Sequence, residues 1–280
     1  MLIAMATDKN YVELAGVLIR SIAANGDVPE AQIVVCGENL DASDHTALRK
    51  CAGGMSVEFV DLDETASARL EHAHRTANWP LTSWGKVLLP DLIRSKAGRL
   101  LYLDCDIVVA KSLRPLFDIE MGSNMLACVP VDKGPDFVDA LNVRLSRAPG
   151  TPYFNSGVML IDLPKWNAAS GTERVLDAAR RFGNSLSYPD QDALNIFANG
   201  EFLQLDRGWN FYSVTQDFSA ASIIHFVYEK PHIAGSKHPA RHLYLGHRSE
   251  TPWSRVPLIS PWVKKRKKWL RKLSTMVGLR

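Results

Sequence analysis

The sequence lacks paired cysteines, long hydrophobic runs and a basic leader. Its four cysteines are scattered between residues 36 and 128 without a Cys-x-x-Cys pair, which favours neither a disulfide framework nor a zinc ribbon. No uninterrupted apolar run approaches the roughly 20 residues that a membrane span needs. The first eight residues contain none of the Lys or Arg that open a secretory signal. We therefore expect a soluble cytoplasmic protein with reduced thiols.

Acidic residues are absent from the last 30 residues, 251–280, which hold nine Lys or Arg. The whole chain has 33 Lys and Arg against 30 Asp and Glu, so residues 1–250 carry 24 basic and 30 acidic side chains, a net charge of −6. An acidic body thus ends in a basic tail. We expect an anionic partner for the tail alone.

The basic tail has the pattern of an amphipathic helix. If a helix follows Pro261, four apolar side chains fall near one stripe with Lys and Arg around it: Trp262, Trp269, Leu273 and Met276. Such helices lie in a membrane interface, with indole rings at headgroup depth. The alternatives are a disordered solvated tail and a nucleic-acid patch, and the acidic body argues against nucleic acid. The sequence predicts a globular body over residues 1–258 and, over 259–280, a tail that binds the anionic inner face of a membrane.

Short apolar runs alternate with helical stretches over the first hundred residues. Strands are predicted at residues 2–6, 32–36, 57–60 and 99–103, and helices at 11–24, 43–51 and 83–95. Further strands are predicted at 124–131, 154–162 and 221–226. Further helices are predicted at 165–182, with an interruption near Gly171, and at 190–198. This alternation indicates a single α/β domain with a mostly parallel sheet, because parallel strands need crossover helices. The run at 99–103 is apolar enough to be a central strand, buried on both faces.

Two aspartates, Asp104 and Asp106, follow this predicted central strand. Residues i and i+2 of an extended chain point the same way, so both carboxylates can face one cation at the end of the strand, where open α/β sheets bind ligands. Two carboxylates suit Mg²⁺ or Mn²⁺, either of which can clamp a diphosphate and neutralise its charge as it leaves. The alternative is a turn in which an aspartate caps the next segment.

Five segments, in the same order, carry a resemblance to a known family. Residues 101–109, which contain the two aspartates, are similar to the metal-binding stretch of the family 8 glycosyltransferases, which include glycogenin and bacterial lipopolysaccharide glucosyl- and galactosyltransferases. The other four segments are Ala6-Thr7-Asp8-Lys9-Asn10-Tyr11, Asn155-Ser156-Gly157-Val158, Asp190-Gln191-Asp192-Ala193-Leu194-Asn195, and His225-Phe226 with Lys230-Pro231. The resemblance runs from about residue 2 to residue 232.

The resemblance implies a GT-A, Rossmann-like domain that binds a nucleotide sugar. It implies a retaining transferase that moves a hexose, glucose or galactose, from a UDP-sugar to a saccharide or glycolipid acceptor in lipopolysaccharide or surface-glycan synthesis. The implied cofactor is Mn²⁺, with Mg²⁺ as the second choice, since an imidazole ligand is softer than a carboxylate. No nucleic acid is expected as a partner.

The resemblance also gives roles to individual residues. The implied metal ligands are Asp104, Asp106 and His225, and the implied catalytic residues are Asn155, Asp190 and Gln191. The implied donor-binding residues are Ala6, Asp8, Asn10, Tyr11, Lys86, Asp104, Asp132 and Lys230. Neutral amides such as those of Asn155 and Gln191 can hydrogen-bond both to sugar hydroxyls and to a developing oxocarbenium ion.

Some of these positions have a simpler interpretation or depart from the family pattern. Asp8 can accept the N3 proton of uracil while Tyr11 stacks on the base, but an aspartate before a helix also serves as an N-cap. Asp192 is expected to act as a charge at a helix N-terminus. Tyr228 stands where the family has glycine, and the spacing from His225 to Lys230 is one residue shorter than in the family.

Two other functions fit parts of the sequence. A nucleotidylyltransferase also positions sugar phosphates with aspartate and Mg²⁺, but it needs a glycine-rich loop after the first strand, and residues 7–10 contain no glycine. A non-catalytic membrane-binding module would use the basic tail. The acidic body and its ordered polar segments argue for an enzyme instead.

Overall fold

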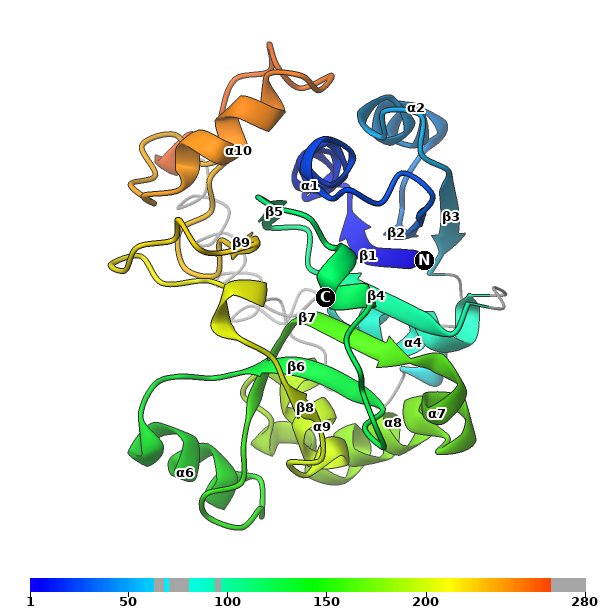
Figure 1. Cartoon of the computed structure of the whole chain (residues 1–280), viewed down its shortest axis with the longest axis vertical. Coiled ribbons are helices and arrows are strands. Elements are labelled where there is room, and N and C mark those ends of the chain that lie inside the picture. The colour runs from blue at the N-terminus through cyan, green and yellow to red at the C-terminus, as the bar shows by residue number, and fades with distance from the viewer. Residues whose placement is uncertain (63–67, 71–80, 94–96, 263–280) are drawn as a thin grey trace, which may run out of the picture.

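The computed structural model describes residues 1–62, 68–70, 81–93 and 97–262. A seven-stranded sheet runs through the molecule, with helices on both faces (Figure 1). Its strands, in sheet order, are β3 (Val57–Asp61), β2 (Gln32–Glu38), β1 (Leu2–Asp8), β4 (Arg99–Leu103), β7 (Phe154–Asp162), β6 (Leu126–Pro130) and β8 (Leu203–Gln204). All pairings are parallel except those of β7, which runs antiparallel to both β4 and β6. The predicted α/β fold with a mostly parallel sheet is therefore confirmed, and β4 is central as expected.

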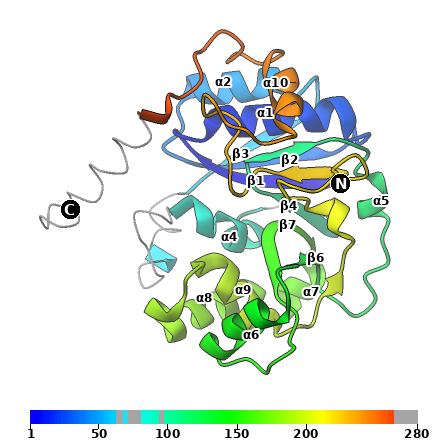
Figure 2. The ribbon, with the colours of Figure 1, turned by 90° about the vertical axis from the view of Figure 1, so that its left-hand side faces the viewer.

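The helices form a layer on each face of the sheet (Figure 2). One layer contains α1 (Val12–Asn25), α2 (Ala42–Cys51), α5 (Arg114–Phe117) and α10 (Arg241–Arg248). The other contains α4 (Gly85–Leu92), α6 (Pro135–Arg144), α7 (Leu163–Ala168), α8 (Gly171–Phe182) and α9 (Pro189–Ala198). Successive residues of a strand point to opposite faces, so Ile3 of β1 packs in the first core and Leu2 in the second. This two-sided burial explains why the strands read as continuous apolar runs.

The strand order reverses beside β1, which places a binding crevice at the carboxyl ends of β1 and β4. The chain winds outward from β1 to β2 and β3, then returns to the other side of β1 as β4. Open α/β sheets bind ligands at such a reversal. Because β7 is antiparallel, its first residues lie at this same edge: Leu103 pairs with Val158, and the backbone N–H of Asp104 donates to the carbonyl of Gly157 at 2.8 Å.

A second, two-stranded sheet adds residues from late in the chain to this edge. The antiparallel strands β5 (Ile107–Val109) and β9 (Ile223–His225) pair so that Ile107 faces His225. This pairing brings His225 beside the two aspartates that precede β5. The sequence predicted a longer strand at 221–226 and missed β5, since three residues after a turn give no periodic signal.

Other elements differ from the predicted ones in ways that follow from local sequence. The predicted helix 83–95 is a 3₁₀ turn (Leu81–Trp84) followed by α4. The interruption predicted near Gly171 in the helix 165–182 is confirmed: Ser170 adopts a left-handed conformation between α7 and α8. Helix α6 and the short β8 were not predicted, and α6 is mostly exposed, so it lacks a clear apolar stripe. Two further 3₁₀ turns, Gly183–Ser185 and Arg207–Trp209, complete the described elements.

The C-terminal part of the body folds back onto α1. Helix α10 packs against α1, where Arg248 Nε and the Tyr244 hydroxyl donate to Glu13 Oε1 at 2.7 and 2.6 Å. Trp253 covers Gly16, at which a Cβ would lie only 2.3 Å from the indole ring. Residues after β9 therefore belong to the same body as the sheet.

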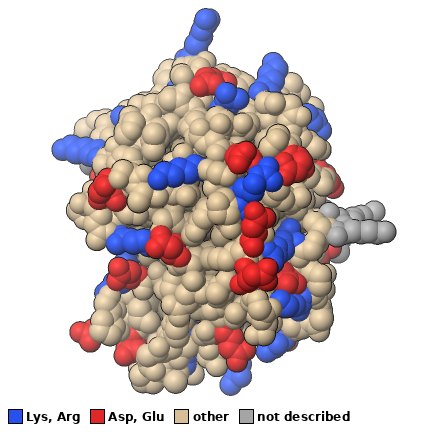
Figure 3. Space-filling view, in the orientation of Figure 1, with Lys and Arg blue, Asp and Glu red and all other residues tan. Residues whose placement is uncertain are grey.

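Most of the predicted tail, 263–280, lies outside the described residues. The last described side chain, Trp262, is 78% exposed. Among the residues that the structure describes, no helix combines the length and apolar character needed to cross a membrane. On the face of the body in Figure 3, Lys and Arg are interspersed with Asp and Glu.

Candidate active site

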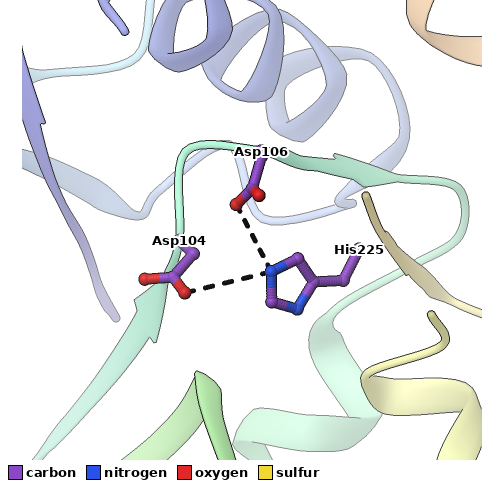
Figure 4. A group of neighbouring side chains, drawn as sticks. All are labelled: Asp104, Asp106 and His225. Carbon is purple, nitrogen blue, oxygen red and sulfur yellow. Dashed lines mark ion pairs between the residues drawn. The ribbon is translucent and has the colours of Figure 1, made fainter. Parts of the chain in front are cut away.

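Three side chains converge at the end of β4. Asp104 and Asp106 leave the chain between β4 and β5, and His225 ends β9 opposite them (Figure 4). His225 Nε2 lies 3.3 Å from Asp106 Oδ1 and 3.9 Å from Asp104 Oδ2. One ligand atom from each of the three residues lies within 4.8 Å of the others. The three predicted metal ligands are thus close enough to share one cation.

The residues around this cluster fit a small divalent ion. Two carboxylates and one imidazole are a ligand set that Mn²⁺ accepts well, and Mg²⁺ accepts the carboxylates. Gly157 of β7 leaves room for the ligands: a Cβ there would lie 2.2 Å from His225 Cε1 and 2.9 Å from Asp104 Oδ2. The other ring nitrogen, His225 Nδ1, lies 2.9 Å from Asn210 Oδ1, the kind of partner that orients metal-binding imidazoles.

Lys86, at the start of α4, joins Asp104 to Asp190. Its side chain is 5% exposed, and its Nζ lies 3.1 Å from Asp104 Oδ1 and 2.9 Å from Asp190 Oδ2. The same amine donates to Ser156 Oγ at 3.1 Å. Burial opposes the charge on Lys86, but the two carboxylates outweigh it and raise the pKa of the amine. All three N–H groups have partners, so Lys86 fixes Asp104 and Asp190 relative to each other.

Lys230 reaches the metal cluster despite its shortened spacing from His225. Its amine contacts Asp106 Oδ2 and donates to the carbonyl of Phe226 at 2.9 Å. Burial favours the neutral carboxyl of Asp106, but the Lys230 amine holds the pKa of Asp106 well below its usual range. Asp106 in turn raises the pKa of Lys230 against its burial. A charged amine therefore lies beside a charged ligand.

Asn155 and Gln191 face each other across β7 and α9. Asn155 Nδ2 donates to Gln191 Oε1 at 3.0 Å, and the backbone N–H of Ser156 donates to the same oxygen at 3.2 Å. Gln191 Nε2 donates to the hydroxyl of Tyr153 at 3.0 Å. These bonds hold two neutral amides beside the charged cluster.

One cavity of about 240 Å³ collects most of the predicted site residues. Its lining includes Lys86, Asp104, Asp106, Asn155, Asp190, Gln191, His225 and Lys230. Aromatic residues that were not predicted line the same cavity, namely Phe137, Tyr153, Tyr188, Tyr212 and Tyr228. The cavity lining therefore combines the charged residues of the metal cluster with several aromatic residues.

Five predicted donor-binding residues lie outside this lining. Asp132 lines a neighbouring cavity of about 220 Å³, which shares Lys133, Tyr212 and Tyr228 with the first. The other four lie at the carboxyl end of β1 or directly after it: Ala6 and Asp8 belong to the strand, and Asn10 and Tyr11 follow it. The Asp8 carboxylate accepts the backbone N–H groups of Asn10 and Tyr11 at 2.8 and 3.0 Å, but it does not cap the helix, because the N-cap of α1 is Tyr11. Tyr11 is 40% exposed, so its ring remains open to a ligand.

Three residues of the site escaped sequence reasoning or have a different role from the expected one. Asp192 lies in the first turn of α9, as expected, but it is also fully buried: it accepts from the backbone N–H groups of Ser187 and Tyr188 and pairs with Arg144 at 2.9 Å. Tyr153 stands two residues before Asn155, so its position in the sequence could have indicated that it belongs to the site. Asn210 follows the turn Arg207–Trp209 and carries no sequence signal of its own.

Comparisons with known proteins agree with this architecture. The model of the family described as "Glycosyl transferase family 8" matches residues 2–233. General stress protein A of Bacillus subtilis (strain 168) is 26% identical over 91% of this chain and 96% of its own length. Lipopolysaccharide 1,3-galactosyltransferase of Salmonella typhimurium is 26% identical over 92% of this chain and 81% of its own length. Among solved structures, galactosyltransferase LgtC in complex with donor and acceptor sugar analogues superposes with a TM-score of 0.79 at 22% identity, covering 91% of this chain and 99% of that one.

Proposed function

This chain belongs to glycosyl transferase family 8, and on that premise we propose that it moves glucose or galactose from a UDP-sugar to a saccharide or glycolipid acceptor, with retention at the anomeric carbon. Family membership makes the chain a glycosyltransferase, which removes the nucleotidylyltransferase and the non-catalytic module from consideration. The observation that carries the finer proposal is the convergence of Asp104, Asp106 and His225 in one cavity with Asn155 and Gln191.

The charged residues of the metal cluster form the proposed binding site of the donor diphosphate. Asp104, Asp106 and His225 would hold Mn²⁺ or, less well, Mg²⁺. When bound, such an ion neutralises the charge of a departing nucleoside diphosphate. Lys230 sits beside Asp106 with a charged amine, so a phosphate oxygen placed there would meet a second cation. Lys86 keeps Asp104 and Asp190 in a fixed relative position.

The rest of the donor would extend to either side of the diphosphate. We place the uridine at the end of β1, where Ala6, Asp8, Asn10 and Tyr11 lie and where the Tyr11 ring is partly exposed. The hexose would lie toward Asn155, Asp190 and Gln191, which also line the cavity. Asp132, in the adjoining cavity, would reach donor or acceptor hydroxyls.

The side chains around Gln191 favour attack by the acceptor from the face that the diphosphate leaves. A covalent route needs a free carboxylate below the anomeric carbon. Within the part of the chain that the structure describes, the carboxylate next to Gln191 is Asp190, which Lys86 and Ser156 already engage at 2.9 and 3.3 Å. Gln191 is a neutral amide fixed by its neighbours, so it suits electrostatic support of an oxocarbenium-like centre.

The acceptor and the place of action are proposed from the relatives and from the sequence. Lipopolysaccharide glycosyltransferases are among the relatives, which supports a lipopolysaccharide or surface-glycan acceptor. We propose a catalytic domain over residues 1–258 and a basic tail over 259–280 that binds the anionic inner face of a membrane from the cytoplasm. A tail of this kind would keep the enzyme beside a lipid-linked acceptor.

A screen of UDP-sugars for hydrolysis in the presence of Mn²⁺ tests the proposed donor and cofactor, because donor hydrolysis needs no acceptor. We expect turnover of UDP-glucose or UDP-galactose that EDTA abolishes. Asp106→Asn should abolish turnover, because the amide removes a charged ligand without changing the size of the side chain. Asp162→Asn is the matched control, since the Asp162 side chain is also mostly buried and pairs with Lys165 at the opposite end of β7 from Asn155.

Full activity in EDTA, or an active Asp106→Asn enzyme, would contradict the metal assignment. Retention is read separately from the anomeric configuration of the first transferred sugar, by proton NMR of the product. An inverted product would remove the same-face mechanism while leaving the family assignment in place.

A further inference from the structure

A continuous series of side-chain hydrogen bonds connects the metal cluster to the core behind α9. Its members, in spatial order, are His225, Asn210, Asn155, Gln191, Tyr153 and Asp192. The five distances are 2.9, 2.8, 3.0, 3.0 and 2.6 Å. We call this series the His225–Asp192 chain. It joins the proposed metal ligand to both amides of the proposed reaction centre.

Two backbone N–H groups of β7 fix which way the central amides point. The N–H of Ser156 lies 3.2 Å from Gln191 Oε1, and the N–H of Gly157 lies 3.1 Å from Asn155 Oδ1. A backbone N–H can only donate, so the atoms that it meets must be the side-chain oxygens. The NH₂ group of Asn155 is therefore the one that faces Gln191.

This orientation determines the proton on His225. Asn155 Oδ1 accepts from Asn210, so the Asn210 atom beside it is Nδ2, and Asn210 Oδ1 faces the imidazole. A carbonyl oxygen only accepts, so His225 Nδ1 must carry the hydrogen. The lone pair of the neutral ring is then on Nε2, which faces Asp104 and Asp106. A cation can be bound by this lone pair and the carboxylate oxygens together.

The far end of the chain is fixed in the same direction. Gln191 Nε2 donates to the Tyr153 hydroxyl, and that hydroxyl donates to Asp192 Oδ1. Asp192 is fully buried and also accepts two backbone N–H groups, so it acts as a rigid acceptor. Burial and the Asp192 carboxylate raise the pKa of Tyr153, which keeps its hydroxyl protonated.

We propose that Asn210 is a positioning residue that keeps the proton on His225 Nδ1, leaves Nε2 for the cation, and transmits this orientation to Asn155 and Gln191. Asn210 is 1% exposed, and each of its side-chain polar atoms has one partner in the His225–Asp192 chain. Buried amides with both ends bonded hold a single orientation, because either flip would leave two donors or two acceptors in contact. The inference rests on the proposed metal site, but its first test does not need turnover.

The proton on His225 can be observed directly in the metal-free protein. We expect ¹⁵N NMR of histidine-labelled protein to show a hydrogen on Nδ1 of His225, with the signal identified by its loss in His225→Gln. Asn210→Leu should lose this preference and show exchange between the two tautomers. A neutral ring with its hydrogen on Nε2, or an unchanged spectrum in Asn210→Leu, would overturn the inference whether or not the protein turns over a UDP-sugar.

Metal affinity gives the second readout. Removing a partner that orients a metal-binding histidine costs about 10- to 100-fold in affinity, so Asn210→Leu should weaken Mn²⁺ binding in the presence of UDP by that factor. Asn142→Leu is the matched control: Asn142 is equally buried, in α6, and donates to the carbonyl of Thr151 away from the metal cluster. Both variants should unfold at lower temperature, but only Asn210→Leu should lose Mn²⁺ affinity. Equal losses of affinity would reduce Asn210 to a structural residue.

Asn210→Asp tests the two hydrogen bonds of Asn210 separately. It also provides a second variant if Asn210→Leu does not fold. Asn210→Asp keeps an acceptor for His225 Nδ1–H but sets an oxygen against Asn155 Oδ1. We therefore expect Mn²⁺ affinity near that of the wild type, with a kcat for donor hydrolysis that is lower by about 10-fold or more and a nearly unchanged KM. Loss of Mn²⁺ affinity as large as in Asn210→Leu would contradict the proposed direction of the chain.

Discussion

Gly157 controls how closely β7 can approach the metal cluster. Its missing Cβ would occupy the space of the His225 ring, 2.2 Å from Cε1, in contact with both the ring and the Asp104 carboxylate. The backbone of Gly157 does not need a positive φ, so an alanine here is excluded by space alone. The side chains that must give way are the proposed ligands.

We therefore expect Gly157→Ala to displace His225 and to lower Mn²⁺ affinity and donor hydrolysis together, while the sheet survives. Gly246→Ala, in α10, is the matched control, since a Cβ at Gly246 meets nothing within 4 Å. Isothermal titration with Mn²⁺ and UDP, together with a circular dichroism melt, checks both variants. Wild-type affinity in Gly157→Ala would show that His225 can move aside without leaving the cation.

Sequence reasoning at this scale found the residues whose type and spacing carry chemistry. Asp104, Asp106 and His225 come together in the structure, as do Asn155 and Gln191. Asn210 could not be found in this way, because an isolated asparagine in a loop gains its role only from two partners that lie 15 and 55 residues away. Asp8 shows the reverse case, because its partners are its near neighbours in sequence. Its carboxylate accepts the backbone N–H groups of the residues two and three positions later.

For the strands and helices, the main feature that the sequence did not reveal is the direction of one strand, β7. The run 154–162 was predicted as a strand, and β7 has those bounds. Its apolar pattern is the same for either direction, because both faces are buried. Only pairing with β4 and β6 makes it antiparallel, and this reversal brings Asn155 to the carboxyl end of β4.

Two ion pairs connect α1 to the segment around α10, and their burial differs. Arg248 and Glu13 are 7% and 17% exposed in their side chains, whereas Arg20 and Glu250 are 26% and 55% exposed. Arg248→Met would leave the buried Glu13 without its cation, which costs about 3 kcal/mol. Arg20→Met should cost less than about 1 kcal/mol, because the exposed pair is screened by water.

Urea unfolding of the two methionine variants measures this difference. A larger loss in Arg248→Met means that α10, which follows the last residue matched by the family at 233, stabilises the sheet through α1. Equal losses would mean that burial of the Glu13 pair contributes little.

At the scale of the whole molecule, the distribution of charge separates the body from the tail. The body shows mixed charges on the face in Figure 3, while residues 251–280 carry nine Lys or Arg and no Asp or Glu. Each basic side chain near an anionic membrane contributes about 1 kcal/mol. A few of them in contact would give recruitment that salt weakens.

Deleting residues 261–280 should therefore release the protein from vesicles of anionic lipid while sparing hydrolysis of the soluble donor. Co-sedimentation at moderate salt measures binding, and vesicles of zwitterionic lipid, which should bind neither form, are the control. If the shortened protein still sediments with anionic vesicles, the tail is not the anchor. If hydrolysis is lost as well, the tail also supports the catalytic domain.

The separation of the proposed metal ligands along the chain has a consequence for biosynthesis. A ribosome delivers Asp104 and Asp106 early, together with the parallel half of the sheet, but β9 supplies His225 only at residue 225 of 280. Until then, a nascent chain has the two carboxylates of the proposed site but not its imidazole, and β5 has no partner strand. Polypeptides released by premature termination before that point would keep a sheet edge rich in polar groups yet lack a complete cation site. Such fragments would not consume the cell's nucleotide sugars.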